Sequence, residues 1–105
     1  MTKKPHFIYQ FTPKDHPELM TDPDAWTEDD SRISEEHFNY LKQGLADEVV
    51  IFAGRSLDGI GPAVVVLEVI NEQAAREFME ADPFVKEGLF GADLHPFRAA
   101  LVRVP

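Results

Sequence analysis

The sequence predicts an α+β fold of the ferredoxin-like type, with the element order βαββαβ, in a single domain over residues 1–105. The first observation behind this prediction is length, because 105 residues suffice for one hydrophobic core and are too few for two. The second is hydrophobic periodicity, which alternates between strand and helix patterns in that order. The third is the apolar character of both middle strands. We expect a four-stranded antiparallel sheet with two helices on one face.

The first strand is predicted over residues 6–12, HFIYQFT, where Phe7, Tyr9 and Phe11 alternate with the residues between them and form an aromatic face. Pro13 ends it. Residues 13–30 contain three prolines and many acidic residues, so we expect a long loop there, of the kind that often carries function. Trp26 in this loop is either a packed anchor or an aromatic side chain that covers a ligand.

One helix is expected after the first strand and another after the third. The first is predicted over residues 34–44, with Ser34 as its N-cap and Gly44 at its exit. Its start could lie earlier, because TEDD at 27–30 resembles a capping box. The second begins after Asn71 and ends at Pro83, and residues 83–90 resemble one further helical turn.

The middle strands are predicted over residues 49–54 and 63–70, joined by a glycine-rich loop, and a last strand over residues 95–104. The last strand has Pro96 near its start and alternating Ala100, Val102 and Val104. A sheet covered on one face only should alternate polar and apolar residues, yet both middle strands are almost continuously apolar. We therefore expect a homodimer in which a second copy of the sheet covers the other face.

The composition argues against several classes of partner. The formal net charge is −9, and the basic residues are scattered singly apart from Lys3 and Lys4. Neither nucleic acid nor an anionic membrane is therefore an expected partner. No apolar stretch is long enough to span a membrane. The chain has no cysteine, and its first residues lack the apolar segment of a secretory signal, so we expect a cytoplasmic protein.

Neither a cofactor nor a metal site is expected. The glycines at 59 and 61 do not follow the phosphate-loop or dinucleotide-binding patterns. The four histidines, at positions 6, 16, 37 and 95, show none of the local spacings by which metal sites are recognised in a sequence.

Two ionisable residues interrupt apolar helix faces. His37 falls at helical spacing with Ile33, Tyr40 and Leu41 on the first helix, and Asp82 continues the apolar face of the second. Two helices packed side by side on one sheet would bring these groups together. A carboxylate that orients an imidazole leaves the other ring nitrogen free to move a proton, which is the basis of general acid/base catalysis.

Simpler explanations exist for both residues. An aspartate directly before a proline that opens a helical turn is a common N-cap, so Asp82 could serve only as a cap. A single histidine on an apolar face is often a core residue bonded to a backbone carbonyl. Tyr9, Arg55 and His95 could line a pocket near His37, although the sequence slightly favours a solvated loop position for Arg55 and His95.

The residues resemble those of the YCII-related family of the dimeric α+β barrel superfamily. The resemblance covers residues 6–12 and 33–104, and is carried by EEHFNYLKQG around His37, by FAG at 52–54 and by EADPFVKEGLF around Asp82. It implies a ferredoxin-like fold whose sheets join in a dimer, and an active-site pair that falls here on His37 and Asp82. This chain departs from the family pattern in having Arg55 where proline usually follows FAG, and a longer 13–30 connection.

Two functions from different classes remain open. The first is a cofactor-independent enzyme in which His37 is the general acid or base, Asp82 orients it, and the substrate is a small organic acid or phenolic compound that is isomerised or undergoes elimination. The second is a non-catalytic dimer that binds a small molecule or a protein. Arg55, if it points inward, would favour an anionic ligand.

Overall fold

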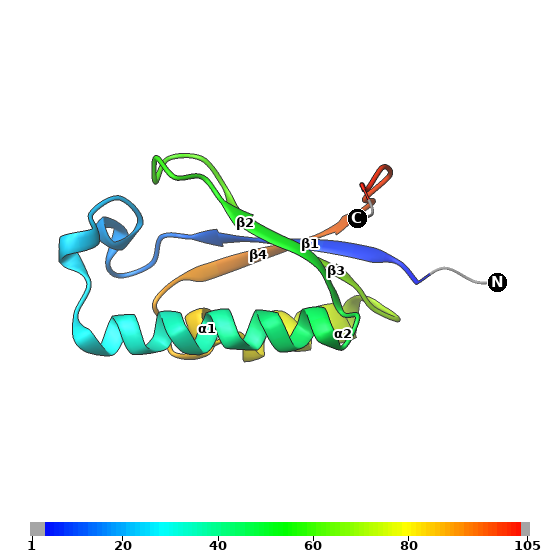
Figure 1. Ribbon diagram of the computed structural model, residues 1–105, viewed down its shortest axis with the longest axis horizontal. Helices are drawn as coiled ribbons and strands as arrows, with labels where there is room; N and C mark the ends of the chain where they lie inside the picture. Colours follow the sequence, from blue (N-terminus) through cyan, green and yellow to red (C-terminus); the bar gives the residue numbers. More distant parts are fainter. Residues whose placement is uncertain (1–3, 104–105) are drawn as a thin grey trace.

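The computed structural model describes residues 4–103 and has the expected α+β architecture (Figure 1). The elements in chain order are β1 (His6–Thr12), the 3-10 turns η1 (Pro17–Met20) and η2 (Pro23–Ala25), α1 (Glu28–Ala46), β2 (Val50–Arg55), β3 (Ala63–Glu68), α2 (Glu72–Ala81), α3 (Pro83–Lys86) and β4 (Gly91–Phe97). The strands pair antiparallel in the order β2-β3-β1-β4. The ferredoxin-like prediction is therefore confirmed.

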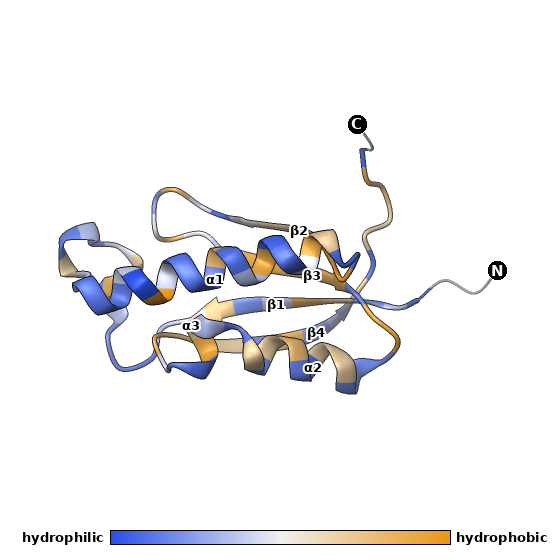
Figure 2. Cartoon of the chain, turned by 60° about the horizontal axis from the view of Figure 1, so that its bottom comes forward, coloured by the Kyte–Doolittle hydropathy of each residue, from blue (hydrophilic) through white to orange (hydrophobic). Residues whose placement is uncertain are grey.

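All the α-helices lie on one side of the sheet, in front of the strands in Figure 2. The aromatic face of β1 turns toward them, since Phe7, Tyr9 and Phe11 are all buried. The register places Phe7 opposite Leu67 and Tyr9 opposite Val65, so β3 contributes its own buried residues to the same face. The hydrophobic core thus lies between this face and the inner sides of α1 and α2.

The other face of the sheet carries no helix (Figure 1). Strand alternation places Ile8 of β1 opposite Val66 of β3, and Phe52 of β2 also pairs with Val66. Phe52 and Phe97 on this face are 48% and 40% exposed. The apolar side chains on this surface, hereafter the open face, are Ile8, Phe52, Val64, Val66 and Phe97.

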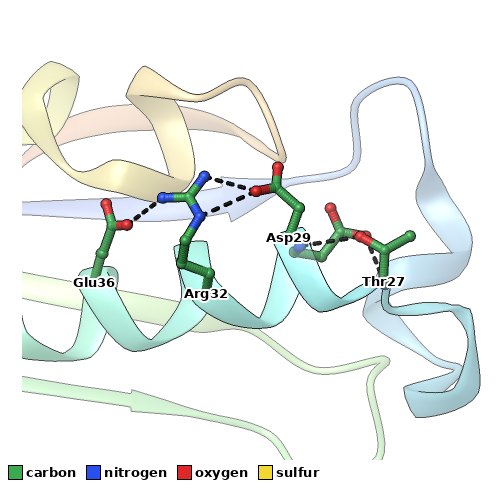
Figure 3. Close-up of polar contacts among 5 residues, drawn as sticks. Thr27, Asp29, Arg32 and Glu36 are labelled. Carbon is green, nitrogen blue, oxygen red and sulfur yellow. Dashed lines mark hydrogen bonds and ion pairs between the residues drawn. The ribbon is translucent and has the colours of Figure 1, made fainter.

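Helix α1 begins six residues before the predicted start at Ser34, at the alternative that the sequence left open. Thr27 Oγ1 accepts a hydrogen bond from Asp30 N–H and the Asp30 carboxylate accepts one from Thr27 N–H, each 3.0 Å long, which completes the capping box. Arg32 then donates to Asp29 and to Glu36 on the outer side of the helix (Figure 3). These contacts stabilise the helical turns that precede His37.

Gly44 was expected at the helix exit and instead lies inside α1, which continues to Ala46. A Cβ atom on Gly44 would approach Val50 Cγ2 to 2.7 Å and Phe78 Cζ to 2.9 Å. The glycine therefore permits the close packing of α1 against β2 and α2. The chain turns back to β2 at Glu48, whose φ of 62° is the left-handed conformation that a glycine more often supplies after a helix.

Two further predictions need correction. The 13–30 segment is a shorter connection than expected, with two 3-10 turns and the buried Leu19, before α1 begins. The last strand runs from Gly91 to Phe97 and not over 95–104, because it pairs only with β1, whose seven residues define the ladder. Ala100 and Val102 lie beyond that ladder, and Val104 is outside the described residues.

Candidate functional site

Asp82 lies at the junction of α2 and α3 and is completely buried. Its extended backbone, with φ −60° and ψ 126°, ends α2, and Pro83 then opens α3. Its Oδ1 atom accepts a hydrogen bond of 3.0 Å from the backbone N–H of Phe84, which makes Asp82 the N-cap of α3. The capping role considered from the sequence is therefore present.

The same carboxylate also binds two side chains from other elements. His37 Nδ1 lies 2.7 Å from Asp82 Oδ1, and the Tyr9 hydroxyl donates to Asp82 Oδ2 at 2.8 Å. Three donors from β1, α1 and α3 thus converge on one buried carboxylate. Burying a polar group is costly unless it is hydrogen-bonded, and these three hydrogen bonds occupy both oxygens of the Asp82 carboxylate.

The imidazole of His37 is held between aromatic rings. It stacks on Phe84, with ring centroids 3.9 Å apart and an interplanar angle of 19°, and meets Phe11 edge-on at 5.4 Å. Its side chain is 15% exposed. Nδ1 of His37 is occupied by its hydrogen bond to Asp82, so the ring nitrogen left for a ligand is Nε2. Nε2 has no hydrogen-bond partner among residues 4–103.

Both tyrosines of the chain lie near this carboxylate and stay protonated at neutral pH. Burial, reinforced by the negative charge of Asp82, raises the pKa of Tyr9 strongly. Burial and the same charge raise the pKa of Tyr40 to about 12. Tyr40 donates its hydroxyl hydrogen to the Phe78 carbonyl of α2 at 2.8 Å. Tyr9 therefore acts as a donor behind Asp82 and not as the pocket-lining residue expected from strand alternation.

A cleft of about 1170 Å³ opens beside His37, between α1, the helix-facing side of β2 and β3, and the segment before α1. This volume exceeds the range of about 300–1,000 Å³ that is usual for small-molecule sites, so a single ring would occupy only part of it. The residues that line it include Leu19, Trp26, His37, Arg55, Phe84 and Phe90.

Trp26 is both anchored and available to a ligand. Its indole N–H donates to the Leu19 carbonyl at 3.0 Å, and its ring lies 6.1 Å from those of Phe84 and Phe90. Its side chain also lines the cleft. The two explanations that the sequence left open for Trp26 are therefore compatible, and the 13–30 segment supplies one wall of the cleft.

Arg55 and His95 lie on opposite faces of the sheet. Arg55 pairs with Ala63 at the end of β2, on the helix-facing side, and lines the same cleft as His37. His95 pairs with Ile8, which turns toward the open face, so the period of two along a strand places His95 on that face as well. The expectation that His95 lines a pocket near His37 is therefore wrong.

The part of the chain that the structure describes, residues 4–103, holds neither a metal-binding cluster nor a membrane-spanning helix. No group of three or more histidine, cysteine or acidic residues in this part of the chain could hold a metal ion. Within the same residues, no helix combines the length and the apolar character needed to cross a bilayer.

Comparison with known proteins gives a family and a fold. The family model of the YCII-related domain matches residues 9–95. Among solved structures, 5-chloro-2-hydroxyhydroquinone dehydrochlorinase from Burkholderia phenoliruptrix AC1100, in complex with 2,5-dihydroxybenzoquinone, superimposes with a TM-score of 0.61 at 16% sequence identity, covering 89% of this chain and 93% of that one. No curated protein sequence matches significantly.

Proposed function

The chain belongs to the YCII-related domain family, and from this premise we propose that it is a cofactor-independent enzyme that uses His37 as general acid/base and Asp82 as the residue that orients it. The substrate class is a small organic acid or phenolic compound bound in the cleft. One observation carries the proposal: Nδ1 of His37 is bonded to a buried, triply hydrogen-bonded carboxylate, while Nε2 has no hydrogen-bond partner among residues 4–103 and the residue lines the cleft.

The chemistry follows from the two ring nitrogens. With Nδ1–H donating to Asp82, the lone pair of the neutral imidazole is at Nε2, where it can remove a proton from a carbon or hydroxyl of the ligand. Asp82 stabilises the imidazolium that forms. The proton then returns at another atom of the same molecule in an isomerisation, or a leaving group such as chloride departs with its electron pair in an elimination.

The structural neighbour supports this substrate class. That protein is a dehydrochlorinase whose bound ligand is a dihydroxybenzoquinone. In the present chain, Trp26, Phe84 and Phe90 provide a wall of aromatic rings that suits a flat ligand of this kind.

We also propose that the enzyme is a homodimer joined through the open face, which the family resemblance favours. We propose the cytoplasm as its location, which the cysteine-free composition favours.

The experiment is a turnover screen of chlorinated hydroquinones and lactones with matched histidine variants. We expect His37→Gln to lower turnover about 10²–10⁴-fold, the usual contribution of a general acid/base. His16→Gln is the control, because His16 is exposed and bonded only to Glu18. A substrate that is turned over equally well by His37→Gln would overturn the proposal.

The alternative is a non-catalytic binding module, and the observation that favours it is the N-cap role of Asp82. Asparagine caps a helix about as well as aspartate and keeps an oxygen for His37. Asp82→Asn therefore keeps the cap of α3 but places an amide donor opposite the Tyr9 hydroxyl, so the urea midpoint of unfolding should fall to the same extent under either function. Turnover should fall in this variant only if the charge of Asp82 serves catalysis.

A further inference from the structure

Arg55 lines the cleft with a charge that nothing else in the described chain neutralises. It is the last residue of β2, on the helix-facing side of the sheet, and its side chain is exposed. None of the ion pairs formed within residues 4–103 includes its guanidinium group. Two basic residues line the cleft, and the ammonium group of Lys42 lies over the Phe38 ring, 5.7 Å from its centroid, whereas Arg55 has no ion-pair partner among residues 4–103.

The acidic residues that line the cleft do not neutralise Arg55. They are Asp22, Glu35 and Asp58, and none forms an ion pair with it. The Asp58 carboxylate accepts from the backbone N–H groups of Ile60 and Gly61, which lower its pKa. Asp22 accepts from Asp24 N–H as the N-cap of η2.

The strand register places Arg55 on the same row of the sheet as a ring that contacts His37. Arg55 pairs with Ala63, and the β1–β3 register continued by one residue puts Phe11 opposite Ala63. Adjacent strands are about 4.8 Å apart, so the backbones of Arg55 and Phe11 are separated by about 10 Å. Since Phe11 meets the His37 ring at 5.4 Å, a long arginine side chain and Nε2 can flank one small molecule.

From these contacts we propose that Arg55 is the anion-binding residue of the cleft and that its ligand is a flat, unsaturated anion, a carboxylate or a phenolate. The charged group binds the guanidinium, and the planar body packs against Trp26 and Phe84 beside His37. A guanidinium presents parallel N–H donors that match two oxygen atoms of a carboxylate. This inference rests on the proposed function for the location of the site and adds the charge of the substrate.

The test compares an anion with its neutral analogue. Trp26 is the sole tryptophan, so its fluorescence reports binding in the cleft of the full-length protein. We expect benzoate to bind at least tenfold more tightly than benzamide to the wild type, and to lose this preference in Arg55→Gln. Arg76→Gln is the charge-matched control, because Arg76 lies on the exposed side of α2 beside Glu72 and away from the cleft.

Each outcome separates this proposal from the proposed function. If benzoate and benzamide bind equally, or if the preference for benzoate survives in Arg55→Gln, the proposed role of Arg55 is wrong even where His37→Gln abolishes turnover. If the preference depends on Arg55 and persists in His37→Gln, the role of Arg55 stands even where turnover does not depend on His37. Since Arg55 is exposed, its replacement should not alter the thermal midpoint.

Discussion

Tyr9 binds the oxygen of Asp82 that His37 does not contact, and so fixes the second side of the carboxylate. Tyr9→Phe leaves Asp82 Oδ2 buried without a donor, which should destabilise the fold by about 1.5–3 kcal/mol. We expect kcat to fall with little change in KM, because the phenol does not line the cleft. Urea denaturation and steady-state kinetics on the same variant measure both effects.

Tyr40→Phe is the matched control for that variant. It removes a hydroxyl whose hydrogen bond goes to the Phe78 carbonyl and not to Asp82. We expect its kcat to match that of the wild type after correction for folded fraction. If the two tyrosine variants lowered kcat equally, the positioning role of Tyr9 would be refuted.

The two tyrosines also make stability depend on alkaline pH. Their pKa values are raised in the folded state, to about 12 for Tyr40 and further for Tyr9, whereas an unfolded tyrosine ionises near about 10. The stability they contribute is therefore complete below about pH 10 and is lost as pH rises through the folded values. We expect tyrosinate absorbance from Tyr9 to appear only as the helical circular dichroism disappears. Two tyrosinates near pH 10 in a folded chain would contradict this.

Sequence reasoning found the pair but not its third member. His37 and Asp82 were recognisable because each is an ionisable residue on an otherwise apolar helix face. Alternation along β1 gave the correct face for Tyr9 but could not say which group its hydroxyl meets, since that depends on how α1 and α2 pack. His95 was misplaced because its face follows from its pairing with Ile8 of β1, a long-range register that the local sequence does not report.

At the scale of the elements, Gly44 determines how closely α1 approaches β2 and α2. Gly44→Ala would gain about 1 kcal/mol of helix propensity. The added methyl group would clash with Val50 and Phe78, and we expect a net loss because overpacking costs about 1–3 kcal/mol and shifts the helix that carries His37.

Gln43→Ala is the control for that substitution, since Gln43 is the exposed neighbour of Gly44 on the same helix. Thermal unfolding of both variants should show a lower midpoint for Gly44→Ala only. A higher midpoint for Gly44→Ala would mean that α1 moves outward at little cost, contrary to the packing described above.

Element boundaries were the least predictable feature of the fold. Two capping signals, Thr27 and Ser34, compete for the start of α1, and the reciprocal hydrogen bonds of Thr27 and Asp30 decide between them. The end of β4 is set by its partner β1, which is a long-range property that local alternation cannot report. The order and type of the main elements could be predicted because hydrophobic periodicity is a local signal.

At the scale of the whole molecule, the open face is the interface of the proposed homodimer. We expect the wild type to sediment as a dimer at micromolar concentration and Phe52→Lys to sediment as a monomer, because a charge would be buried at the interface. Phe38→Lys is the control, since Phe38 lies on α1, on the other side of the sheet, and is 62% exposed. A wild-type monomer would contradict the proposed dimer.

The most direct test of the central claim is a long-range ¹H–¹⁵N correlation spectrum of the histidine rings, recorded at a pH where free imidazoles are neutral. We predict that His37 shows a protonated Nδ1 and a bare Nε2, whereas the exposed His16 averages its two tautomers. Asp82→Ala should abolish the difference between these two residues. A His37 ring protonated at Nε2, or one that averages as His16 does, would contradict the claim that Asp82 holds a proton acceptor toward the cleft.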